Sequence, residues 1–266
     1  MKKFFILVST VVLMTGCSTR PVNEQNQATG KRVLLAVFAH PDDETTVSPV
    51  LAKYAAEGVE VHLAIATDGR YGVTPHAGIP AGDSLATTRA AELKCAAEKL
   101  GIHPILFGLH DQLKMQGGYE PVHAQLSELR SRVTSLLDSL KPDAVITWGA
   151  SGWTGHHDHR LVSAVVTEVY ESKTWDHPMQ LFYPAIPSGK IPEGSGGFAT
   201  VDSAYLNVRI STSAEDQEKA KASLHCHQSQ YTPQVMDQMR AMISSALGNT
   251  TYFKSHHNDK VSTSLF

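Results

Sequence analysis

The sequence predicts a single α/β domain built around a mostly parallel sheet. From Arg32 onward, short apolar runs of strand length alternate with longer helical patterns, which is typical of βαβ units. The run 33–38 is apolar at every position, as expected of a central strand that is covered on both faces. With 266 residues, 42% of them hydrophobic, the chain can bury the core of one such domain, and a second full domain is not expected.

The elements of the first half follow from local signals. A helix is expected over residues 49–57 because Gly58 ends its pattern, and the apolar run 59–67 predicts the second strand. A loop rich in Gly and Pro, residues 68–83, then leads into a helix over residues 84–100. Loops of that length usually carry function.

The second half is expected to continue the alternation. The predicted helices cover residues 121–140 and 214–227. The predicted strands cover residues 105–107, 144–148, 180–183 and 205–210. No element is assigned beyond Gln230.

The first residues are typical of an export signal rather than of the fold. Lys2 and Lys3 precede an apolar run, residues 4–14, and Cys17 follows two small residues. The apolar run is too short to cross a bilayer as a stable helix. Cys17 therefore resembles the lipidated cysteine of bacterial lipoproteins, and an ordinary cleaved signal is the alternative.

Lipidation at Cys17 would make the protein an exported lipoprotein, anchored to a membrane on its periplasmic side. Ser18 after that cysteine resembles the pattern that directs lipoproteins to an outer membrane. We therefore expect a signal with its lipidation site at 1–17, a flexible polar tether at 18–31 and the folded domain at 32–266.

Charge and cysteine content exclude one class of partner and leave another question open. The formal net charge is -3 and the basic residues are scattered, so nucleic acid is not an expected partner. Cys95 and Cys226 would lie in a compartment that permits disulfides, but their spacing does not decide between a disulfide and two isolated thiols. The sequence does not indicate an oligomeric state.

A hexapeptide with metal-binding chemistry, Ala-His-Pro-Asp-Asp-Glu, stands at residues 39–44, where the first predicted strand ends. Ligands bind at that edge of an open parallel sheet. His40 and Asp43 supply an imidazole nitrogen and a carboxylate oxygen, both suited to zinc, and Asp42 between them can reach a metal-bound water. For either aspartate alone the alternative is a helix cap, because Pro41 is a common first helical residue.

A second segment, Thr-Gly-His-His-Asp-His at residues 154–159, follows the strand predicted at 144–148 and reaches the same edge of the sheet. His159 would complete a site with His40 and Asp43 and leave the fourth position open for water. An open position implies catalysis rather than a structural metal. The alternative is a solvated His-rich loop that binds metal without any function.

The two segments together resemble the PIG-L/LmbE-like family of zinc-dependent N-acetylglucosaminyl deacetylases. Three further stretches stand in family order, Thr-Asp-Gly at 67–69, Arg-Ala-Ala-Glu at 89–92 and His-Gln-Ser-Gln at 227–230, so the resemblance covers residues 32–253. It implies a Rossmann-like three-layer fold with a mostly parallel sheet, LmbE-like in architecture, and hydrolysis of an amide that releases an acetyl group.

The resemblance also implies roles for individual residues. Zn²⁺, or Fe²⁺ in its place, would be held by His40, Asp43 and His159. Asp42 would be the general base, and His156, oriented by Asp158, would stabilise the oxyanion or protonate the leaving amine.

Other positions match the family less completely. Arg89 matches an arginine that the family uses near its substrate, and the alternative is a surface charge paired with Glu92. His157 stands where many members have proline, and Thr154 stands where some have a tyrosine that helps the oxyanion. His227 is expected only near the pocket, not as a metal ligand.

The expected substrate is a small N-acetylated sugar or another amide, and the sugar follows from the resemblance alone. Two alternatives remain open at this point. One is a zinc hydrolase of a different amide, and the other is a lipid-anchored protein that binds zinc or carbohydrate without turnover.

Overall fold

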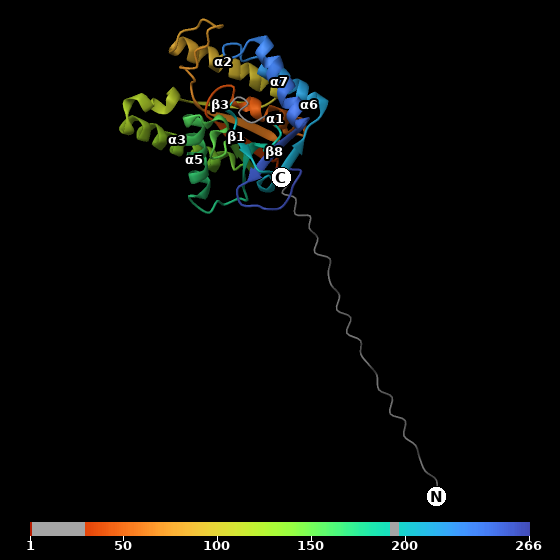
Figure 1. Cartoon of the computed structure of the whole chain (residues 1–266). Coiled ribbons are helices and arrows are strands. Elements are labelled where there is room, and N and C mark those ends of the chain that lie inside the picture. The colour runs from red at the N-terminus through yellow and green to blue at the C-terminus, as the bar shows by residue number, and fades with distance from the viewer. Residues whose placement is uncertain (2–29, 192–196) are drawn as a thin grey trace. The chain divides into compact units, whose positions relative to one another are not determined.

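The structure, a computed structural model, describes Met1 and residues 30–191 and 197–266 (Figure 1). Lys31–Phe266 makes up one compact unit. The predicted signal, the lipidation site at Cys17 and nearly all of the tether at 18–31 lie outside the described residues, so they stay predictions. Among the described residues, no helix has the length and apolar character that crossing a membrane requires.

The sheet of the described chain has the strand order β3-β2-β1-β4-β5-β8-β7, with β6 paired to β5. Its parallel part consists of β1 Val33–Phe38, β2 Glu60–Thr67, β3 His103–Leu109, β4 Ala144–Thr147 and β5 Gln180–Pro187. The strands β8 Thr250–Ser255 and β7 Val208–Ser211 continue the sheet in antiparallel sense, and the short β6 Thr200–Val201 is parallel to β5. The predicted α/β class with a mostly parallel sheet is confirmed.

Helices cover both faces of this sheet and make the fold three-layered (Figure 1). One face is covered by α1 Ser48–Ala56, α2 Asp83–Leu100 and α6 Ala214–Leu224, with α7 Pro233–Leu247 beside α6. The other face is covered by α3 Tyr119–Leu140 and α5 His157–Glu171. Shorter helical turns are α4 Gly152–Gly155, η1 Asp43–Thr46, η2 Asp111–Gly117 and η4 Ser203–Tyr205.

Each helix layer packs on the sheet through apolar residues at helical spacing. In α2, Leu93, Ala97 and Leu100 are buried against the first face, and in α3 Leu129 and Val133 are buried against the second. The strands between them carry apolar residues on both sides, which explains the continuous apolar run of β1.

The observed boundaries differ from the predicted ones in the second half. The strand predicted at 205–210 begins at Val208, because Asp202 accepts a hydrogen bond from the Ala204 amide and holds the preceding residues in a 3-10 turn. The helix predicted at 214–227 ends at Leu224. The sequence assignment missed α7 and β8, although Thr232 caps α7 just before a proline, which is a recognisable start signal.

The strand order places β1 at a topological switch point. After β1 the chain runs outward through β2 and β3, then returns to β4 on the other side of β1, where Val37 and Thr147 are paired. The loops that follow Phe38 and Thr147 therefore start side by side at one edge of the sheet. In folds of this class, ligands bind in the crevice at such a point.

Candidate metal centre and active site

Three side chains from the two predicted motifs converge at this edge. His40 Nδ1 lies 3.2 Å from His159 Nε2, and His159 Nε2 lies 3.2 Å from Asp43 Oδ1. His40 Nδ1 also lies 3.7 Å from the other oxygen of Asp43. All three side chains are buried. The structure thus brings together the three residues that were expected to hold a metal ion.

Neighbouring groups leave the facing atoms of this cluster as acceptors. His159 Nδ1 lies 2.9 Å from the carbonyl oxygen of Gly152, and His40 Nε2 lies 3.0 Å from Asp158 Oδ2. With a proton on each of these outer nitrogens, His40 Nδ1 and His159 Nε2 keep lone pairs that face each other.

Hydrogen bonds also orient the third acceptor, the carboxylate of Asp43. Asp43 Oδ2 accepts the amides of Ala39 and His40 at 2.9 and 2.8 Å and the indole N–H of Trp148 at 3.3 Å. This leaves Asp43 Oδ1 directed at His159. With their outer nitrogens protonated, the two imidazoles and Asp43 present three facing acceptors, which a cation between them would satisfy.

The charge and spacing of the cluster fit a divalent metal. Burial alone would lower the pKa of His40, but the carboxylates of Asp111, Asp158 and Asp43 raise it well above its ordinary value. These surroundings therefore favour a positive charge at this position. The ligand atoms of a tetrahedral zinc site lie about 3.3 Å apart, close to the separations found here. Two imidazoles and one carboxylate form a donor set that zinc prefers, with one position left for water.

Gly152 allows His159 to reach this position. Its φ is +63°, and a Cβ added there would lie 3.1 Å from His159 Cβ and 2.7 Å from Arg160 Cγ. Gly155, in the same loop, has φ +79° but open space where its Cβ would lie. Both substitutions to alanine carry a similar backbone strain, so the difference between them reports the contacts with His159 and its neighbour Arg160.

We expect Gly152→Ala to weaken zinc binding by about 10-fold relative to Gly155→Ala, since displacing an outer partner of a ligand costs 10- to 100-fold in affinity. Competition against a chromophoric chelator measures both affinities. Equal losses in the two variants would show that Gly152 does not hold His159 in place.

Asp42 lies beside the metal cluster and is held by two donors. Its Oδ1 accepts from Arg89 Nη2 at 3.1 Å and its Oδ2 accepts from the Tyr231 hydroxyl at 3.1 Å. Its backbone is left-handed, with φ +110°, and its side chain caps no helix. The helix-cap alternative is therefore wrong for Asp42. Burial raises its pKa even though the nearby Arg89 opposes the shift.

Arg89 is buried rather than a surface charge. The residue is 4% exposed, and its side chain also donates to the carbonyl oxygens of Gly69 and Pro41, at 3.0 and 2.5 Å. Glu92, its alternative partner, instead accepts from the amide and hydroxyl of Ser229, both at 2.6 Å. The alternative of a surface pair with Glu92 is wrong, because the guanidinium is buried and contacts Asp42 instead.

Replacing Arg89 should be costly because it leaves Asp42 buried with one partner fewer. We expect Arg89→Met to lower the free energy of unfolding by about 3 kcal/mol. Arg130→Met is the control, because the Arg130–Glu168 pair is exposed and should contribute less than about 1 kcal/mol. Urea unfolding measures both; similar losses would contradict the buried pair.

His156 lies on the open side of the cluster. Its ring centroid is 4.8 Å from those of both His40 and His159. The backbone amide of Asp158 donates to His156 Nδ1 at 3.3 Å, whereas the Asp158 carboxylate lies against His40 and His157. Asp158 thus contacts His156 through its main chain and not, as would be expected for an orienting carboxylate, through its side chain.

This contact determines which tautomer His156 presents. Because Nδ1 accepts, a neutral ring carries its proton on Nε2. Burial, followed by positive charge on His40 and His159, lowers the pKa of His156 to about 4. The neutral ring therefore offers an N–H donor beside the metal cluster.

Two further residues belong to the site but were not predicted. Asp111 accepts the amides of Tyr71 and Gln112, each at 2.8 Å, and its Oδ1 lies 3.4 Å from His40 Nε2. Asp111 follows β3 at the same edge of the sheet, so the edge rule could have found it. Tyr231 gave no such signal, because it lies beyond the last element assigned from the sequence.

The metal cluster and Asp42 line one cavity of about 450 Å³. The charged residues lie beside Tyr71, Trp153, Phe198 and Met239 in its wall. Thr154 also lines this cavity, at the position where some family members carry tyrosine. A cavity of this size that combines polar groups with aromatic walls is typical of a small-molecule binding site.

Comparison with known proteins agrees with these motifs. Residues 35–170, more than half of the chain, match the family described as PIG-L, GlcNAc-PI de-N-acetylase. A 1D-myo-inositol 2-acetamido-2-deoxy-alpha-D-glucopyranoside deacetylase from Mycobacteroides abscessus is 31% identical over 178 residues. The match covers 61% of this chain and 63% of that relative, so the chain spans less than two thirds of it.

Solved structures share the fold at low identity. The zinc-inhibited form of the teicoplanin deacetylase Orf2 is 18% identical with a TM-score of 0.60, covering 85% of this chain and 100% of that one. The 4-carboxy-2-hydroxymuconate hydratase GalB from Pseudomonas putida is 15% identical with a TM-score of 0.61, covering 85% and 97%. Because a hydratase shares the fold, the fold does not specify the reaction. The family match runs from β1 through both motifs to α5, and on that basis the chain belongs to the PIG-L, GlcNAc-PI de-N-acetylase family.

Proposed function

We propose that this protein is a zinc-dependent deacetylase that hydrolyses the acetamide of an N-acetylglucosamine-type substrate. The observation that carries the proposal is the arrangement inside one cavity: a buried carboxylate, Asp42, lies beside the His40–Asp43–His159 cluster, with the His156 ring on its open side. Binding alone requires neither Asp42 nor His156, whereas hydrolysis requires both a base and a donor.

Zinc, when bound by His40, Asp43 and His159, would polarise the amide carbonyl and acidify water. The protein's own groups supply the rest. Asp42 accepts the proton of the attacking water; each carboxylate oxygen has two lone pairs, so the bonds from Arg89 and Tyr231 leave room for it. His156 donates a hydrogen bond from its Nε2–H to the oxygen on which negative charge develops, and the proton that Asp42 has taken from water passes to the leaving amine.

The substrate class rests on the relatives and on the shape of the cavity. The curated relative is named for an acetamido sugar linked to inositol. A cavity of about 450 Å³ with Trp153 and Phe198 in its wall suits one sugar unit and its acetamide. A substrate amide that is not part of a sugar would be hydrolysed by the same catalytic groups, and only its contacts with this wall would differ.

The decisive experiment measures acetate release by protein that lacks residues 1–17. The substrates are a panel of N-acetylated amino sugars and matched acetamides without a sugar. We expect release from the sugars that stops after chelation and returns with zinc. Release only from the other amides would overturn the sugar assignment, and full metal occupancy without release from any compound would overturn the deacetylase.

We also propose that the protein is exported and anchored through a lipid on Cys17. In support, the Cys95–Cys226 disulfide is of a kind that persists outside the cytoplasm. Metabolic labelling with palmitate should mark the wild-type protein and not Cys17→Ala, and the variant should move from the membrane to the soluble fraction. Equal labelling of both proteins would rule out this anchor.

A further inference from the structure

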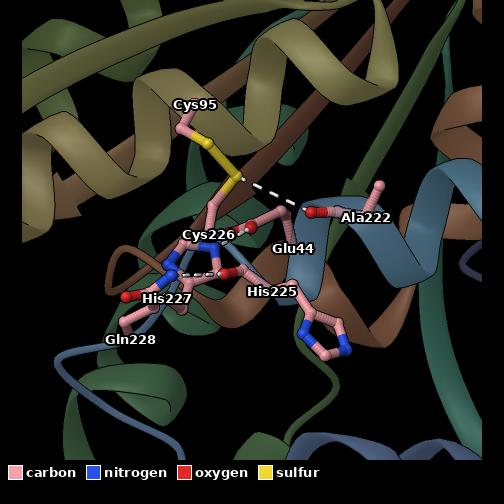
Figure 2. The surroundings of a disulfide bond; sticks show 7 residues. All are labelled: Glu44, Cys95, Ala222, His225, Cys226, His227 and Gln228. Atoms are coloured by element: carbon pink, nitrogen blue, oxygen red, sulfur yellow. Dashed lines mark hydrogen bonds and ion pairs between the residues drawn. A yellow bond between two sulfur atoms is a disulfide. The ribbon is translucent and has the colours of Figure 1, made fainter. Parts of the chain in front are cut away.

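A disulfide joins two parts of the chain that both reach Asp42. Cys95 in α2 and Cys226 after α6 are bonded, with their Cα atoms 5.9 Å apart and 131 residues between them in sequence (Figure 2). Cys226 lies in the segment between α6 and α7. We refer to residues 225–231 as the base-supporting turn, because two of its side chains lead to the catalytic base.

The first connection runs through His227. Its Nε2 lies 2.5 Å from Glu44 Oε1, and both side chains are fully buried below the disulfide (Figure 2). The other oxygen of Glu44 accepts the backbone amide of Asp42 at 3.1 Å. Burial alone would lower the pKa of His227, but the negative charge of Glu44 raises it. This ion pair helps to hold the left-handed backbone of Asp42, a conformation that persists only where its surroundings impose it.

The second connection runs through Tyr231, whose hydroxyl donates to Asp42 Oδ2 at 3.1 Å. Gln230 Nε2 donates to the carbonyl oxygen of Gly72 at 2.9 Å, which ties the same turn to the loop before α2. The turn therefore contacts the side chain of the base directly and reaches its main chain through Glu44.

The other partner of Asp42 comes from α2. Arg89 donates to Asp42 Oδ1, and Glu92, one turn further along the helix, accepts from Ser229 of the turn. Cys95 lies one more turn along the same helix. Asp42 is thus held between α2 and the base-supporting turn, and the disulfide links α2 to that turn covalently.

We propose that the Cys95–Cys226 disulfide is a positioning element for the catalytic base. The turn lies outside regular secondary structure, so its position depends on its side-chain contacts and on this covalent bond. Without the bond, the turn shifts, Tyr231 and His227 lose their contacts, and Asp42 leaves the orientation needed to take a proton from water. The inference rests on the proposed function, in which Asp42 is the base.

The test compares wild type with the Cys95→Ser, Cys226→Ser double variant, assayed where circular dichroism shows both to be folded. We expect kcat to fall about 10- to 100-fold with little change in KM, because a small misplacement of a catalytic group costs up to about 100-fold. Leu137→Ala is the control: Leu137 is buried in α3 on the opposite face of the sheet, so it lowers stability while kcat is retained. A wild-type kcat in the double cysteine variant overturns the proposal.

A double-mutant cycle with Tyr231→Phe tests the route of the effect. If the disulfide acts through Tyr231, the combined variant loses less kcat than the product of the two separate fold-losses. If the combined loss equals that product, the two changes act independently and the proposal is overturned. Should the cysteine variant not fold, reduction of the disulfide in the folded wild-type protein, with the free thiols counted by titration, removes the same bond. The same loss of kcat is then expected, and its absence overturns the proposal.

Hydrogen exchange separates this inference from the deacetylase proposal. Amides of residues 40–44 and 225–231 should exchange faster in the double cysteine variant than in Leu137→Ala, whether or not any substrate is hydrolysed. If wild type releases no acetate yet this pattern appears, the function fails and the positioning stands. Unchanged exchange in both segments overturns the positioning.

Discussion

Asp42→Asn is expected to lower the rate of acetate release by about 1,000-fold, because a positioned general base contributes 10²- to 10⁴-fold. Asparagine has nearly the volume of aspartate, its oxygen can still accept from Arg89 and its amide N–H can donate to the Tyr231 hydroxyl oxygen, but it cannot take the proton of an attacking water. Since Asp42 is not among the three facing acceptors of the cluster, the metal content should remain that of the wild type.

The measurement is kcat together with zinc stoichiometry on the same preparation. Asp138→Asn is the control, because Asp138 is an exposed aspartate on α3, paired with Lys173 and not part of the cavity lining. A variant that binds zinc normally and hydrolyses as fast as the wild type would remove Asp42 from the mechanism and favour a different base.

His159→Gln is expected to abolish both zinc retention and activity. The change leaves only His40 and Asp43 of the cluster and also removes the bond from His159 Nδ1 to Gly152. Loss of an outer partner alone costs 10- to 100-fold in metal affinity, so loss of the ligand itself should exceed about 100-fold. Elemental analysis after dialysis and the acetate assay check the two losses together.

His157→Gln provides the matched control. His157 is the adjacent imidazole in the same segment, but it lies against Asp158 and does not face His40 or Asp43. It should retain zinc and most of the activity. Equal loss of metal in both variants would mean that the segment binds the ion as a whole, as in the alternative of a His-rich loop.

The sequence by itself determined the strands of the parallel part of the sheet and the two motifs. A strand covered on both faces is continuously apolar, and its neighbours in a parallel sheet repeat that pattern, so β1, β2 and β4 could be located from hydrophobicity alone. Because the carboxyl ends of parallel strands share one edge, the segments after β1 and β4 could also be expected to meet. The cluster of His40, Asp43 and His159 follows from that local information.

Only the tertiary structure decided how the base is held. Arg89, Tyr231 and Asp111 contact the site from α2, from the turn before α7 and from the end of β3, and each contact spans a long sequence separation. The pairing of Cys95 with Cys226 is of the same kind, since 131 residues lie between them.

The reason is that sequence patterns report local preferences. Hydrophobic periodicity and turn residues specify an element and the face that it buries, whereas a polar contact between distant segments depends on how those elements pack. The expectation that Arg89 stands equally well on the surface beside Glu92 shows the limit: helical spacing is the same in both cases, and burial against Asp42 arises only when α2 packs on the sheet.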